Sequence, residues 1–90
     1  MPELSERQKN LLRIIIDEYI ESADPVGSEA IVEKHSLGVS PATVRNEMVA
    51  LTRDGFLKQL HTSAGRVPTS TGLKFYIKEL MKEQDVSVKD

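Results

Sequence analysis

Apolar residues recur at helical spacing near the start of the chain. The stripe consists of Leu11, Leu12, Ile15, Ile16, Tyr19 and Ile20. Ser5 and Gln8 precede it at capping-box spacing, in which the hydroxyl accepts a helical N–H and the amide side chain reaches back. The pattern predicts an amphipathic helix that begins after Ser5 and ends before the segment SADPVGS, where Pro25 disfavours helix at Asp24.

A second, shorter helix is predicted from Glu29 to His35. Ser28 stands where a helix N-cap is needed, and Ile31 is expected to point inward. Gly38 follows the helix and can adopt the positive φ that is common just beyond helix ends.

The segment SPATVRNEMVALTRDG carries the clearest helical signal in the chain. Ser40 is a suitable N-cap, and Pro41 fits the first helical position, where its missing N–H costs nothing. Val44, Met48 and Leu51 recur at i, i+4 and i+7 and form one inward stripe. The residues expected on the outer face are Arg45, Asn46, Val49, Ala50 and Arg53.

A short β-hairpin is predicted after this helix. The apolar-biased segment 56–60 predicts a strand, and the segment RVPT is the candidate for a return strand. Ser63, Ala64 and Gly65 are expected to make the turn, with Gly65 supplying a positive φ. Pro68 stands near the end of the second strand, which suits a two-stranded edge ribbon.

Together these elements predict a mainly α (α+β) fold, a winged helix-turn-helix with a three-helix core. A last helix is predicted after the hairpin, capped by Thr69 or Ser70. Its apolar stripe would consist of Leu73, Tyr76, Ile77, Leu80 and Met81. The domain is expected over residues 1–84, followed by a frayed tail over 85–90. Within it, we expect the helix-turn-helix over 28–54, a two-stranded hairpin wing over 56–69 and a C-terminal helix over 70–82.

Charge is divided unevenly along the chain. The net charge is −2, yet residues 1–39 carry four basic and eight acidic groups, whereas residues 40–82 carry seven basic and three acidic groups. A polyanion would meet a positive half on a slightly acidic molecule, which favours nucleic acid as a partner. Chance segregation of solvated charge would give the same counts.

The helix after Ser40 has the ends that a DNA-recognition helix requires. Ser40, Ala42 and Thr43 make a small first turn that leaves helical N–H groups open to a phosphate. Arg53 would hold a cation near the backbone at the far end.

The outer face of the same helix offers side chains that can read base edges. Arg45 can pair bidentately with guanine, Asn46 can pair with adenine, and Val49 or Ala42 can meet a thymine methyl group. The simpler interpretation is the solvated face of an amphipathic helix. Small and apolar residues share this face and acidic residues are sparse, which favours contact with double-stranded DNA.

The stretch HTSAGRVPT is predicted to form the tip of the wing. His61, Ser63 and Arg66 are its candidate DNA contacts, with Arg66 entering a minor groove or pairing with a phosphate. His61 could equally bond to the hairpin backbone. A phosphate-binding P-loop is excluded because the required glycine and lysine spacing is absent.

Enzymes, metalloproteins and membrane proteins find little support in the sequence. There is no Cys, and two His residues make a poor metal site. No Ser-His-Asp set, carboxylate pair or Gly-rich nucleotide motif is evident, so no catalysis and no cofactor are expected. Without a signal peptide or an apolar stretch of about 18 residues, the chain is expected to be cytoplasmic and free of membrane contact.

Two motifs carry a resemblance to a known family. The first runs SPATVRNEM over 40–48, and the second runs HTSAGRVPT over 61–69, with PVGS at 25–28 and GFL at 55–57 as shorter matches. Over about residues 4–82 the chain resembles the N-terminal DNA-binding domain of the HrcA family of bacterial heat-inducible transcription repressors. Other winged helices share the layout but not the second motif.

The resemblance implies a repressor that binds an inverted-repeat operator ahead of chaperone operons, as a homodimer. In the family, a larger C-terminal region carries dimerisation and receives the signal through the chaperonin. The alternative is a winged helix that serves as a protein-interaction or dimerisation module without binding DNA. Its sign would be an exposed cluster of Ile14, Val32 and Val49.

Overall fold

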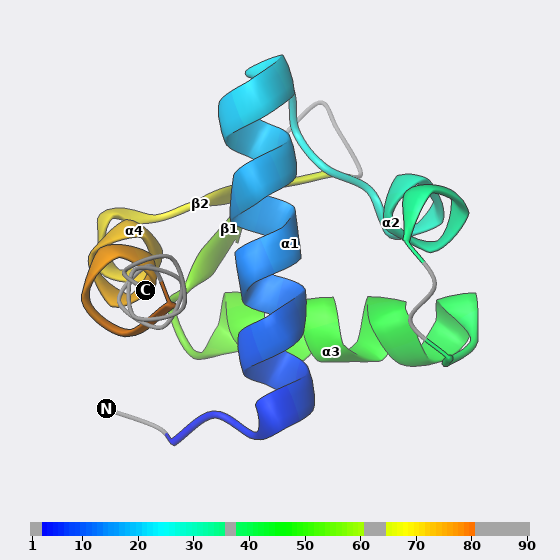
Figure 1. Ribbon diagram of the computed structural model, residues 1–90, viewed down its shortest axis with the longest axis horizontal. Helices are drawn as coiled ribbons and strands as arrows, with labels where there is room; N and C mark the ends of the chain where they lie inside the picture. Colours follow the sequence, from blue (N-terminus) through cyan, green and yellow to red (C-terminus); the bar gives the residue numbers. More distant parts are fainter. Residues whose placement is uncertain (1–2, 36–37, 61–64, 81–90) are drawn as a thin grey trace, which may run out of the picture.

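The structure is mainly helical, with one short β-hairpin (Figure 1). The computed structural model describes residues 3–35, 38–60 and 65–80. Its elements are α1 (Glu6–Ser22), α2 (Ser28–Lys34), α3 (Pro41–Arg53), β1 (Leu57–Gln59), β2 (Arg66–Pro68), α4 (Ser70–Phe75) and the π-helical segment η1 (Tyr76–Leu80). The winged helix-turn-helix prediction is therefore confirmed. The predicted ends of the domain and the tail over 85–90 lie outside the described residues.

The start of α1 follows the sequence pattern closely. Ser5 Oγ accepts a hydrogen bond from the Gln8 N–H at 3.1 Å, and Gln8 Oε1 accepts one from the Ser5 N–H at 3.0 Å. The predicted capping box is thus confirmed. The helix ends at Ser22, where Ala23 adopts a left-handed φ of 61° and donates to the Tyr19 carbonyl.

The predicted cap of α2 is wrong. Gly27, not Ser28, occupies the cap position, and no side chain caps the helix. The reason lies one residue earlier, because Val26 is held in an extended strand conformation against β2 and the helix begins as soon as that pairing ends. After α2, Gly38 has the predicted positive φ, 73°.

The core lies where α1 crosses α3, with α2 and α4 on opposite sides of α1 in the view of Figure 1. Its fully enclosed side chains are aliphatic apart from one phenylalanine, as the small number of aromatics predicts. They are Leu12, Ile15, Ile16, Ile31, Val44, Leu51, Phe56 and Leu57. Burying each such side chain contributes about 1.5–3 kcal/mol, so these residues hold the helices and the hairpin together.

The hairpin is anchored by a third extended segment that the sequence did not reveal. β1 and β2 pair antiparallel, with Lys58 opposite Val67 and Gln59 opposite Arg66. Val26 lies on the other side of β2, where its N–H and C=O each form a 2.8 Å hydrogen bond with the backbone of Arg66. The connection between α1 and α2 is therefore fastened to the turn end of the wing.

The C-terminal helix begins as predicted and then departs from the α-helical pattern. Thr69 Oγ1 accepts the Gly72 N–H at 3.0 Å, which confirms Thr69 as the cap. From Tyr76 the chain is π-helical, and the predicted stripe is confirmed only in part. Leu73 and Tyr76 pack against the core, whereas Ile77 is 62% exposed. Met81 and the side chain of Leu80 lie outside the described residues. Phe75 also packs against the core, with its ring edge-on to Phe56 at 5.5 Å between centroids.

Tyr76 fastens η1 to α1. Its hydroxyl donates a hydrogen bond to the Asp17 carboxylate, which also forms an ion pair with Arg13 at 3.6 Å. The hydrogen bond to Asp17, helped by partial burial, raises the pKa of Tyr76 to about 12.

Replacing Tyr76 by Phe should change stability in a pH-dependent way. Because the folded pKa is raised above its ordinary value of 10.0, the bond stabilises the fold below pH 10, and its contribution is lost as pH rises towards 12. Tyr76→Phe should therefore lower the free energy of unfolding by about 1 kcal/mol at neutral pH. Between the two pH values the variant should lose less stability than wild type, because it has no hydroxyl to ionise. Urea unfolding across this range measures both effects, with Tyr19→Phe as the control. Parallel pH profiles for wild type and Tyr76→Phe would contradict this assignment.

Candidate nucleic-acid interface

The first turn of α3 is small and exposed. Ser40 Oγ accepts a hydrogen bond from the Thr43 N–H at 3.1 Å, and the two hydroxyl oxygens lie 3.0 Å apart in a second hydrogen bond. Pro41 is the first helical residue, as predicted, and it is exposed together with Ala42. No bulky side chain of the turn itself stands over this end of the helix.

The two faces of α3 divide as the sequence predicts. Val44, Met48 and Leu51 are buried in the core. The exposed residues of the helix beyond its first turn are Arg45, Asn46, Val49 and Arg53. Val49 leaves 48% of its surface exposed, so the outward face combines hydrogen-bonding groups with an apolar patch. This mixture suits base edges and thymine methyl groups better than bulk water.

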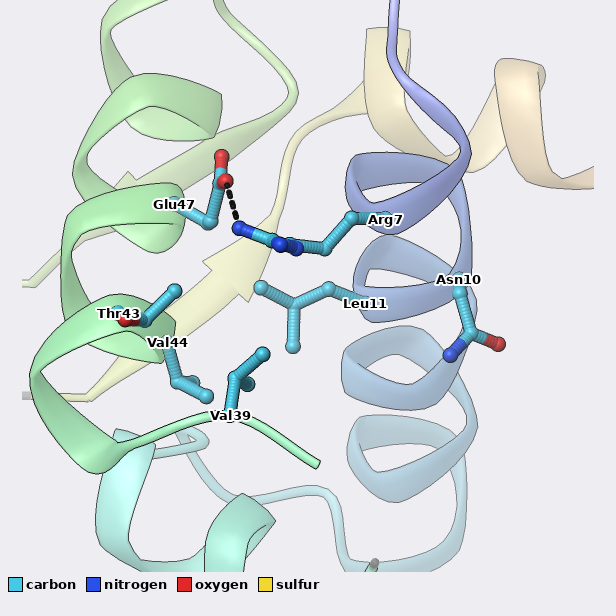
Figure 2. A pocket seen from close by; sticks show the side chains of 7 residues that line it. All are labelled: Arg7, Asn10, Leu11, Val39, Thr43, Val44 and Glu47. Carbon is cyan, nitrogen blue, oxygen red and sulfur yellow. Dashed lines mark ion pairs between the residues drawn. The ribbon is translucent and has the colours of Figure 1, made fainter. Parts of the chain in front are cut away.

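Glu47, the acidic residue of α3, is paired with a cation from another helix. Glu47 forms an ion pair with Arg7 of α1, at 3.5 Å between Oε2 and Nη1 (Figure 2). The pair lies over a small pocket of about 40 Å³ whose apolar wall includes Leu11, Val39 and Val44. The carboxylate therefore lies beside a cation on the flank of the face that carries Arg45 and Asn46.

Arg66 lies at the turn end of the hairpin, where the sequence placed it. It belongs to β2, opposite Gln59, and its side chain is half-buried. Its Nε donates a hydrogen bond to Thr52 Oγ1 of α3 at 2.9 Å. His61 and Ser63, the other two candidates on the wing, lie outside the described residues.

The reason predicted for Gly65 is wrong. Its φ is outside the left-handed region, so it does not supply the positive φ expected of the turn. Space explains the glycine instead, because a Cβ there would lie 2.8 Å from the Cβ of Pro25 and 3.1 Å from the N of Val26. The α1–α2 connection thus packs directly on the hairpin.

A groove brings three elements together beside α3. Arg45 of α3 and Arg66 of β2 line it together with Gly27, Ser28, Glu29 and Gln59, and its volume is about 460 Å³. Sequence reasoning missed Glu29 and Gln59 as neighbours of Arg45. No local signal marks them, because their proximity depends on the pairing of Val26 with β2.

A charge cluster ties α2 to α1. Glu18 accepts hydrogen bonds from Lys34 Nζ at 3.1 Å and from His35 Nε2 at 3.3 Å. These bonds, that of Lys34 first, lower the pKa of Glu18 below its ordinary value. The cluster thus links the first helix of the helix-turn-helix to α1.

The described residues form neither a metal-binding cluster nor a membrane-spanning helix. Over 3–35, 38–60 and 65–80, no three His, Asp or Glu side chains gather in a way that could hold a metal ion. No helix in these ranges has the length and apolarity that crossing a bilayer requires.

Comparison with known proteins agrees with the fold. Residues 3–85 match the family described as winged helix-turn-helix transcription repressor, HrcA DNA-binding. The chain belongs to this HrcA family. Its members' DNA-binding domain is that of transcription repressors, a role without catalysis.

Several curated relatives carry the name heat-inducible transcription repressor HrcA. The protein of Acetivibrio thermocellus is 49% identical over 97% of this chain and 25% of its own length. That of Thermomicrobium roseum is 53% identical over 94% of this chain and 24% of its own length. The chain thus spans about a quarter of the HrcA proteins it matches.

A crystal structure, described as that of a hypothetical protein, has the same fold. It superposes with a TM-score of 0.84 at 45% sequence identity, covering 89% of this chain and 25% of the other. The winged helix-turn-helix arrangement is thus found in a solved relative as well.

Proposed function

We propose that the chain binds double-stranded DNA sequence-specifically, as the operator-reading module of a heat-shock transcription repressor acting on chaperone operons. The observation that carries the proposal is the exposed face of α3, where Arg45 and Asn46 stand beside the half-exposed Val49. Membership of the HrcA family supports it.

Each residue of the proposed interface has a role that its chemistry suggests. Arg45 and Asn46 read base edges in the major groove, and Val49 or Ala42 meets a thymine methyl group. The phosphate contacts are assigned to Ser40, Thr43 and Arg53 on α3 and to His61, Ser63 and Arg66 on the wing.

Partners and location follow from this role. The relatives named HrcA are about four times as long as this chain, and we expect the homodimer and any chaperonin contact to involve the additional region. Two copies would then place two α3 helices on the half-sites of an inverted repeat. Because the chromosome is the target, the expected location is the cytoplasm.

The experiment that tests the proposal begins with a pool of duplexes that carry a randomised inverted repeat. The chain should enrich one sequence, which is then titrated against its scrambled version at two salt concentrations. We expect a clear preference for the enriched duplex and affinities that fall steeply with salt. Equal affinity for enriched and scrambled duplexes would refute sequence-specific binding.

The alternative, a protein-interaction module without DNA binding, predicts a cluster of exposed apolar residues. Ile14 is buried and Val32 packs against the core, which leaves Val49 as the exposed member of the expected set. The cluster that would favour this alternative is therefore not formed by these three residues.

Removing Arg7 should weaken DNA binding through Glu47. Arg7→Ala leaves the carboxylate of Glu47 unpaired on the flank of α3, where it repels phosphates. We expect the affinity for the enriched duplex to fall about two- to fivefold, and the double variant Arg7→Ala/Glu47→Gln to regain most of the loss. Titrations at one low salt concentration measure both. A double variant as weak as Arg7→Ala would show that Arg7 acts on its own rather than through Glu47.

A further inference from the structure

A hydrogen-bonded chain connects the wing to α3. Arg66 Nε donates to Thr52 Oγ1 at 2.9 Å, and Thr52 Oγ1 donates to the Met48 carbonyl at 2.8 Å. Because the hydroxyl hydrogen of Thr52 is committed to Met48, an oxygen lone pair is left to accept from Arg66. The direction of the guanidinium group is therefore set by a residue of the recognition helix.

The backbone of Arg66 is fixed as firmly as its side chain. Its N–H and C=O each bond to Val26 at 2.8 Å, and it stands opposite Gln59 in the hairpin. Gly65, the preceding residue, packs so closely on Pro25 that no side chain fits there. Arg66 is thus held at both ends, between the α1–α2 connection and α3.

We propose that Thr52 is a positioning residue for DNA recognition, which holds the Arg66 guanidinium beside Arg45 and so fixes the wing relative to α3. The proposal rests on the DNA-binding function proposed above. Its basis is the geometry of the groove, where Arg45, Arg66, Met48 and Ser28 line one hollow into which the hydrogen-bonded chain leads.

The expected benefit is preorganisation. An arginine side chain has many rotamers, and ordering it at the moment of binding lowers affinity. Thr52 orders Arg66 before DNA arrives. Thr52 itself is half-buried beneath the wing, so its effect is expected to pass through Arg66.

The test compares Thr52→Val, which removes the hydroxyl at nearly constant shape, with Thr52→Ser, which keeps it. In the 90-residue chain, Thr52→Val should weaken binding of the enriched duplex about three- to tenfold, and Thr52→Ser should bind within about twofold of wild type. In an Arg66→Ala background, Thr52→Val should have no further effect, because the side chain that it positions is gone.

A DNA-free measurement separates positioning from general stability. The Nε–H resonance of Arg66, assigned by its loss in Arg66→Ala, should be protected from exchange in wild type and Thr52→Ser but not in Thr52→Val. The proposal would be overturned if Thr52→Val bound the enriched duplex as tightly as wild type. It would also be overturned if Thr52→Val lowered the affinity as much in the Arg66→Ala background as it does in wild type. If wild type shows no preferred duplex, the proposed function fails first, and the positioning role fails with it. If wild type discriminates and Thr52→Val does so equally, the positioning role alone fails.

Discussion

Replacing Gly72 by Ala is expected to destabilise the domain by about 3 kcal/mol, the largest effect of any glycine in the described residues. A Cβ at this position would lie 2.2 Å from the carbonyl oxygen of Phe56 and 3.2 Å from its carbonyl carbon. Both atoms belong to the backbone that leads into β1, so no flexible side chain can move aside. Glycine to alanine in a helix normally stabilises by up to about 1 kcal/mol, so the expected sign is the reverse of the usual one.

Chemical denaturation of wild type, Gly72→Ala and Gly27→Ala measures this effect. Gly27 has no atom within 4 Å of its would-be Cβ and has a φ of −100°, so its change should cost less than about 1 kcal/mol. For a domain of this size, the Gly72 variant should melt more than about 10 °C lower. An unchanged or raised melting temperature would mean that α4 does not approach Phe56 so closely.

Replacing Arg45 by Ala is expected to weaken binding of the enriched duplex about 10- to 100-fold and to relax the preference for one base pair. Arg45 projects from the exposed face of α3 and also lines the groove shared with Arg66. Water cannot replace a bidentate pair with guanine at the same geometry. The affinity should therefore decrease mainly for the enriched sequence.

The matched control for charge is Lys74→Ala. Lys74 is an exposed cation of α4, outside the proposed interface, so its loss should change affinity little and leave base preference intact. Competition between the enriched duplex and single-base variants reports the preference directly. If Arg45→Ala lost affinity equally for enriched and scrambled DNA, Arg45 would be a phosphate contact rather than a base reader.

Features of the fold that depend on neighbouring residues along the chain were predictable from the sequence. The capping box at Ser5, the cap at Ser40 and the inward stripe of α3 each involve residues within two turns of one helix. Local hydrogen bonding and helical periodicity determine such features, so the pattern of residue types was enough to find them.

Features that depend on distant pairing were not predictable. In the sequence, Val26 lies in the segment that connects two predicted helices. Its pairing with Arg66 arises only when the hairpin folds back against the α1–α2 connection. The same pairing sets the start of α2 and ties the α1–α2 connection to the turn end of the wing. The change to π-helix at Tyr76 likewise has no signature in the apolar spacing.

The candidate site likewise has a part that could be predicted from the sequence and a part that could not. Arg45, Asn46 and Val49 share one exposed face because they share one helix, so their grouping followed from the sequence. The approach of Glu29 and Gln59 to Arg45 depends on how three elements pack, which spacing along the chain does not encode.

Whether the outer face of α3 lies on DNA can be measured by following the backbone amide resonances of the chain as the enriched duplex is added. We expect saturable changes concentrated at Ala42, Arg45, Asn46 and Val49, with smaller ones near Gln59, and much weaker changes with scrambled DNA. Changes confined to the exposed residues Ile20 and Ile77, far along the chain from α3, or no saturable change at all, would contradict it.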